Sequence, residues 1–129
     1  MTEQFNVFDR QNEKVLDTKS PILNVDKNGL IRFNGSAVTL MNLKPGDGVK
    51  FLQSKKDAKE WSIIKVKDPF SYPLRKLGKY GLGFNGSTLR HALLKSLIIT
   101  TGGMVCPIGS EPTAVDTWSL ITSAAKQRQ

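Results

Sequence analysis

The chain has little of the chemistry that most enzyme and metal sites need. Its 129 residues include one cysteine, Cys106, and one histidine, His91. A single cysteine excludes an internal disulfide, and these two residues are too few for a Cys/His zinc site. A Cys106–His91 catalytic pair would depend on folding to bring the two together, and no flanking motif supports it. We therefore expect a protein that is not an enzyme and holds no metal or other cofactor.

Long apolar runs are also missing. No stretch reaches the roughly 18–20 apolar residues of a membrane span. The start, "MTEQFNVFDRQ", has neither the basic nor the apolar region of a secretory signal. Together with the unpaired cysteine, these absences lead us to expect no membrane partner and a cytoplasmic location. The hydrophobic fraction of 39% is typical of a globular chain and not of a disordered one.

What the sequence does have is positive charge, a net +8. Between Lys44 and Lys95, twelve Lys or Arg stand against four acids, whereas the remaining seven basic and seven acidic residues balance. Clustered positive side chains attract phosphate backbones and release counterions on binding. A basic surface that only aids solubility is the alternative. We interpret the placement of the charge as a prediction of a nucleic-acid partner.

The quartet FNGS occurs twice, starting at Phe33 and at Phe84, 51 residues later. A second landmark follows each copy, WSII from Trp61 and WSLI from Trp118. Between the landmarks each copy predicts a strand, a capped helix, a strand and a returning strand. The quartet lacks the glycine spacing and the lysine of a P-loop. We therefore interpret FNGS as architecture, with the glycine permitting a sharp turn and the phenylalanine anchoring it in the core.

These elements predict an α+β fold that is mostly β. Two tandem strand–helix–strand–strand repeats would form a pseudo-twofold β-rich core with short helices. We expect Ser36 and Ser87 to be the helix N-caps. The predicted segments are N-terminal strands at 1–27, a first repeat at 28–68, a basic and aromatic connector at 69–80, a second repeat at 81–122 and a tail at 123–129, all in one integrated domain.

The stretch "NGLIRFNGSAVTLMNLKPGDGVKFLQSKKDAKEWSIIKV", residues 28–66, resembles the swapped-hairpin domain of AbrB-type and MazE-type DNA-binding proteins. The shared features are a strand opening with a glycine, a short helix, an LKPGD turn at 43–47 and two strands that pair as a hairpin. The resemblance implies a second, weaker copy at 81–122 and the reading of duplex DNA by basic side chains, with Arg32 at a strand position where the family has them. The family's Ile-Pro is replaced here by Phe33-Asn34, and the second copy has no KPGD.

The connector "KVKDPFSYPLRKLGKY", residues 65–80, combines basic and aromatic side chains. Basic groups neutralise phosphates while aromatic rings stack on bases, a combination typical of single-strand binding, as in PC4-like and Whirly-type proteins. The structural alternative is that Phe70 and the prolines fasten a linker across the core.

We therefore expect a small non-enzymatic DNA-binding protein, an AbrB-like transcription regulator, with duplex slightly favoured over single strand and a homo-oligomer as an option. The alternatives are a single-stranded nucleic-acid-binding protein and a structural or assembly module of a phage or mobile element. The candidate nucleic-acid-binding residues are Arg32, Lys44, Lys50, Lys65, Lys67, Tyr72, Arg75, Lys76, Lys79, Tyr80, Arg90 and Lys95.

Overall fold

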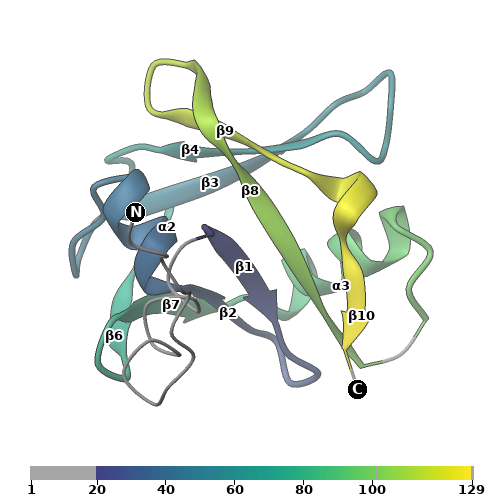
Figure 1. The fold of residues 1–129 in the computed structure, drawn as a ribbon, viewed down its shortest axis with the longest axis horizontal. Helices are drawn as coiled ribbons and strands as arrows, with labels where there is room; N and C mark the ends of the chain where they lie inside the picture. Colours follow the sequence, from purple (N-terminus) through teal and green to yellow (C-terminus); the bar gives the residue numbers. More distant parts are fainter. Residues whose placement is uncertain (1–19, 101, 129) are drawn as a thin grey trace, which may run out of the picture.

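The structure, a computed structural model, describes residues 20–100 and 102–128 and is mostly β (Figure 1). The strands are β1 (Ile22–Val25), β2 (Leu30–Phe33), β3 (Gly48–Gln53), β4 (Trp61–Lys65), β5 (Tyr72–Pro73), β6 (Arg75–Leu77), β7 (Gly81–Asn85), β8 (Gly103–Ala114), β9 (Thr117–Leu120) and β10 (Lys126–Arg128). The helices are α2 (Gly35–Leu40), α3 (Ser87–Ser96) and a short 3-10 helix, η1 (Thr122–Ala124). No helix in the described ranges is long and apolar enough to cross a bilayer.

All strand pairs are antiparallel, in the order β5-β3-β4-β9-β8-β1-β2-β7-β6, with β10 added beside β8. The two ends of this order, β5 and β6, are consecutive in the chain and separated only by Leu74. A single extended segment therefore pairs with β3 through β5 and with β7 through β6. The sheet curls back on itself and nearly closes into a barrel, which leaves few free strand edges.

Leu74 is the corner at which the barrel closes. Its side chain is buried, and its backbone N–H donates to the carbonyl of Asp47 at 2.8 Å. Its carbonyl accepts from the N–H of Gly46, also at 2.8 Å. Gly46 has a φ of +93°, a conformation that glycine adopts without steric cost. The LKPGD turn therefore fixes the segment that closes the sheet.

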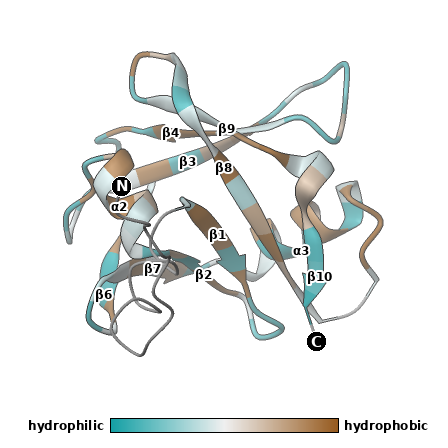
Figure 2. Cartoon of the chain, viewed as in Figure 1, coloured by the Kyte–Doolittle hydropathy of each residue, from teal (hydrophilic) through white to brown (hydrophobic). Residues whose placement is uncertain are grey.

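The core is built from the alternation of side chains along the strands. In β2, Ile31 and Phe33 point inward and Arg32 points outward, as period 2 requires. The sheet interior near the closure contains three phenylalanine rings. The ring centroid of Phe51 lies 6.4 Å from that of Phe33 and 6.0 Å from that of Phe84. Figure 2 shows β1 as largely hydrophobic and β6 and β10 as largely hydrophilic.

The two FNGS quartets do have a structural role, and both phenylalanines are buried as predicted. The predicted caps are wrong. The N-cap of α2 is Asn34, whose Oδ1 accepts from the N–H of Ala37 at 2.9 Å, and α3 follows Gly86 without a side-chain cap. An asparagine side chain accepts from the free N–H groups of the first turn as well as a serine does, so Asn34 can cap the helix two residues before Ser36.

Two other expectations change with the structure. The connector at 69–80 contains β5 and β6 and is part of the barrel wall. The tail contains β10, which pairs with β8. Of the N-terminal strands expected at 1–27, β1 is present and pairs with β2 and β8, and the earlier one lies outside the described residues.

Helices α2 and α3 end in the same backbone motif. The N–H of Leu43 donates to the carbonyl of Val38, and that of Ile99 to the carbonyl of Leu94, each across five residues. The residue before each donor has a positive φ, +50° at Asn42 and +59° at Ile98. This is the left-handed position that ends many helices. Asparagine tolerates it, but the β-branched Ile98 is strained there and is also 76% exposed.

We expect the substitution Ile98→Asn to stabilise the protein by about 1 kcal/mol, because it relieves a left-handed β-branched residue without removing a buried contact. The measurement is urea unfolding followed by tryptophan fluorescence. The reciprocal substitution Asn42→Ile serves as the control and should destabilise by a similar amount. Equal stability of both variants and the wild type would contradict the strain at Ile98.

Candidate nucleic-acid interface

The barrel divides into two halves by strand pairing. The β1 half contains β1, β2, β6, β7, β10 and residues 103–107 of β8, with their turns and α3. The β4 half contains β3, β4, β5, β9 and residues 108–114 of β8, with their turns and the turn after α2. Arg32 and most of the basic connector belong to the first half, and the LKPGD turn belongs to the second.

Charge is distributed very unevenly between these halves. Among the described residues, the β1 half carries nine Lys or Arg against one acid, and the β4 half carries seven Lys against six acids. The acid of the β1 half, Asp26, accepts backbone N–H groups of Asn28 and Leu30 in the β1–β2 turn. The excess therefore lies on the β1 half, and not on one stretch of sequence. Its basic residues are Lys27, Arg32, Arg75, Lys76, Lys79, Arg90, Lys95, Lys126 and Arg128.

Two of the predicted lysines in the β4 half are held by acids. Lys50 Nζ lies 2.8 Å from the Asp68 carboxylate, and this contact is the main cause that lowers the pKa of Asp68. Lys65 Nζ lies 3.6 Å from the Asp47 carboxylate and donates to the carbonyl of Asn42 at 2.8 Å. Both ammonium groups therefore already have acidic partners within the protein.

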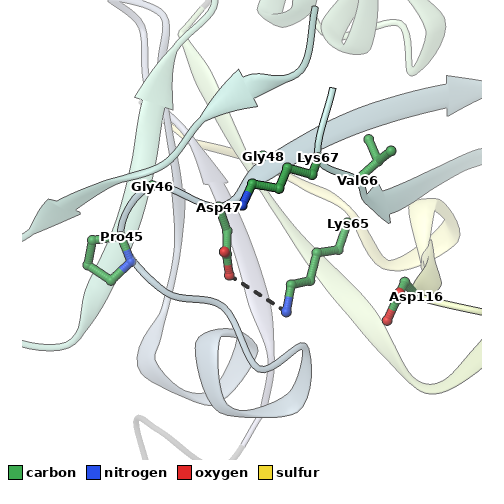
Figure 3. Close-up of a pocket in the computed structure, with 8 residues that line it drawn as sticks. All are labelled: Pro45, Gly46, Asp47, Gly48, Lys65, Val66, Lys67 and Asp116. Carbon is green, nitrogen blue, oxygen red and sulfur yellow. Dashed lines mark ion pairs between the residues drawn. The ribbon is translucent and has the colours of Figure 1, made fainter. Parts of the chain in front are cut away.

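The LKPGD turn lines an open groove of about 440 Å³ in the β4 half (Figure 3). Lys65 extends toward Asp47 in this view, and Lys67 and Asp116 complete the lining. Lys44 is exposed beside the groove, and its backbone N–H donates to the Asp47 carboxylate. Because both signs of charge line the groove, it offers a polyanion little net attraction.

Arg32 lies across strand β7 on the outer surface of the β1 half. A Cβ added at Gly81 would stand 2.5 Å from Arg32 Nε, and one added at Gly78 would stand 3.5 Å from Arg32 Nη2. The arginine therefore passes directly over the backbone of Gly81 toward the β6–β7 turn. A side chain at position 81 would block this path. Glycine is therefore needed here because it has no Cβ, and not because of an unusual φ.

Arg75 shares this outer surface. In the ladder, Gly83 stands between the two arginines, paired with Arg32 on β2 and with Arg75 on β6. With the Asn85 amide oxygen facing it, Arg75 donates from Nη1 and Nη2 at 3.3 and 3.1 Å. Lys76 is exposed as well but points to the opposite face of β6, because side chains alternate along a strand.

The β6–β7 turn adds an ammonium group and an exposed aromatic ring. Lys79 is exposed, and its Nζ lies 5.6 Å from the centroid of the Tyr80 ring, within cation–π range. Tyr80 is 57% exposed. We use the name Arg32 face for the surface formed by Arg32, Arg75, Lys79, Tyr80 and Asn85.

Three other predicted site residues have different surroundings. The Tyr72 ring stacks on Phe84 at 4.4 Å with an interplanar angle of 16°, so it packs with the core. Arg90 donates to the carbonyls of Asp26 and Gly102 and joins α3 to two turns, so we assign it a structural role. Lys95 is exposed near the end of α3, which follows β7 at the end of that strand opposite to the β6–β7 turn.

The structure adds basic residues that the sequence reasoning missed. Asn24 pairs with Arg32, and its Oδ1 accepts from Arg128 Nη1 at 3.0 Å. Lys126 pairs with Val105, which in turn pairs with Asn24. The positive surface therefore continues from the Arg32 face over β1 to β10. Only the pairing of β10 with β8 reveals this, because the C-terminal segment has no motif of its own.

The residues considered for catalysis are not brought together. Cys106 is fully buried in the barrel, whereas His91 is exposed on α3. Burial raises the pKa of the Cys106 thiol to about 11, which disfavours the reactive thiolate. Within residues 20–100 and 102–128, no group of three or more His, Cys, Asp or Glu side chains is arranged to hold a metal ion.

Comparison with known proteins gives no family assignment. No family model matches the chain, and no curated protein or solved structure shows a significant similarity to it. The resemblance of residues 28–66 to AbrB-type domains therefore stays a prediction.

We expect Cys106 to resist thiol reagents in the native protein. A pKa raised from 9.0 to about 11 lowers the thiolate fraction at pH 8 by about a hundredfold, and burial limits access further. The measurement is the rate of reaction with a disulfide reagent at pH 8, with and without denaturant. A rate in native buffer equal to that of the unfolded chain would contradict the buried thiol.

Proposed function

We propose that the protein is a small non-enzymatic DNA-binding protein that contacts phosphates with the Arg32 face. The observation that carries this proposal is the separation of charge, with nine basic residues against one acid on the β1 half. Such a surface attracts a polyanion and releases counterions when phosphates are neutralised. A basic surface that served solubility alone would not need to concentrate its excess on one half of the barrel.

The side chains of the Arg32 face are also suited to bind phosphate. Arginine presents a planar set of donors that matches phosphate oxygens. Arg32 and Arg75 are separated by one intervening strand, roughly 10 Å at the usual strand spacing, and both face outward. The amide of Asn85 holds Arg75, and the backbone of β7 supports Arg32. Arginines that are already oriented lose less entropy on binding.

We also propose that the barrel is an internal duplication with a pseudo-twofold axis. The units are β1-β2-α2-β3-β4 and β5/β6-β7-α3-β8-β9. Exchanging them preserves the pairing order, because β1 pairs with β2 and β8 while the β5/β6 segment pairs with β7 and β3. Equivalent positions also pair with each other. Ser62 of the WSII motif pairs with Ser119 of the WSLI motif, and Arg32 and Gly83, which directly precede the two FNGS quartets, pair as well. The shared helix-end motif is further support.

The proposed function is tested by reversing charge on one half only. We expect Arg75→Glu combined with Lys79→Glu to weaken DNA binding at least about tenfold and to reduce the salt slope by roughly 1–2, because two phosphate contacts are lost. The measurement is fluorescence anisotropy with labelled single-stranded and duplex DNA of equal length, each across a salt series.

The matched control is Lys55→Glu combined with Lys59→Glu in the β3–β4 turn of the β4 half. It changes the net charge by the same amount but leaves the Arg32 face intact. We expect it to weaken binding far less. Equal weakening by the two double variants would show that only net charge matters, and wild-type protein that binds neither DNA form at low salt would refute the function.

A further inference from the structure

We propose that Tyr80 and Arg32 form a stacking platform for one unpaired base, so that the protein binds single-stranded nucleic acid in preference to duplex. This inference rests on the proposed function and specifies its ligand. It concerns the β6–β7 turn. Lys79 and the exposed Tyr80 are consecutive in this turn, and the guanidinium group of Arg32 lies beside the next residue, Gly81.

The Cβ end of the Tyr80 side chain packs closely against the start of α2. A Cβ added at Gly35 would stand 3.1 Å from Tyr80 Cβ and 3.8 Å from its Cγ. The first FNGS glycine therefore lets Tyr80 approach the start of α2 closely. The ring itself remains 57% exposed. The other aromatic rings near the closure, including Tyr72 and Phe84, pack against each other and leave Tyr80 as the exposed ring of this half among the described residues.

Arg32 is held next to the same turn. Its side chain passes over Gly81, the residue after Tyr80, and its Nη2 reaches the neighbourhood of Gly78. The guanidinium group thus flanks the turn that carries the ring, and a guanidinium plane stacks on bases as aromatic rings do. The whole segment from Arg75 to Asn85 contains no acidic residue.

This combination of groups fits an unpaired base better than a base pair. In a duplex the base faces are covered by their neighbours, so an exposed tyrosine on a convex barrel wall has no face to stack on. In a single strand the base is free, and the phosphates on either side of it come within reach of Lys79 and Arg75. Base stacking with flanking phosphate contacts binds without a strong sequence preference.

The experiment compares Tyr80→Leu and Tyr80→Phe on a labelled oligo(dT) strand and on a duplex of equal length. Leucine keeps the apolar bulk but removes the aromatic face, so we expect about a five- to hundredfold loss on the single strand and less than about a twofold change on the duplex. Phenylalanine retains the ring and should bind as the wild type does. Circular dichroism checks that each variant is folded.

Two further variants sharpen the test. Gly81→Ala keeps every charge but displaces Arg32, and we expect it to weaken single-strand binding as well. Phe70→Leu removes the other highly exposed aromatic ring, 87% exposed in the β4–β5 connection, and should change nothing.

The outcomes separate the two proposals. If Tyr80→Leu binds both DNA forms like the wild type while the Arg75→Glu, Lys79→Glu variant binds weakly, the platform is refuted and the DNA-binding function stands. If Phe70→Leu and Tyr80→Leu weaken binding equally, a specific platform is refuted too. If the wild type binds neither form at low salt, both proposals fail.

Discussion

The closure of the sheet at Leu74 is the constraint on which the rest of the structure depends. One extended segment supplies both edge strands, so the chain can pair with β3 and β7 only if it bends at this residue. The bend is stabilised by a buried side chain and by two backbone hydrogen bonds to the LKPGD turn. Buried backbone groups need such partners, and here a turn of the β4 half provides them for the corner that joins the two halves.

That closure also creates the candidate interface. Once β6 lies beside β7, Arg75 faces the same side as Arg32, and the β6–β7 turn carries Lys79 and Tyr80 alongside them. Because the glycines of β7 carry no side chains, Arg32 can lie across the strand. Some residues therefore both stabilise the fold and shape the candidate interface. The first FNGS glycine, for example, begins α2 and also accommodates Tyr80.

The order of strand pairing is more symmetric than the surface. Exchanging the two proposed units preserves that order, but the two residues that pair at the centre of β2 and β7 are an arginine and a glycine. The two FNGS asparagines also differ in their contacts, since Asn34 caps α2 whereas Asn85 contacts Arg75. The barrel therefore presents one asymmetric site instead of two equal ones. A single ligand strand lying across β2 and β7 would meet such a site.

Elements with strong local signals could be predicted from the sequence. The strand at Leu30–Phe33, the apolar spacing of α3 and the burial of both FNGS phenylalanines follow from periodicity and turn residues. Which basic residues lie close together depends on the packing of distant segments. Lys50 and Lys65 lie within the basic stretch of sequence yet contact acids, whereas Arg128, far from that stretch, extends the positive surface. Charges interact through space, and strand pairing between distant segments sets those distances.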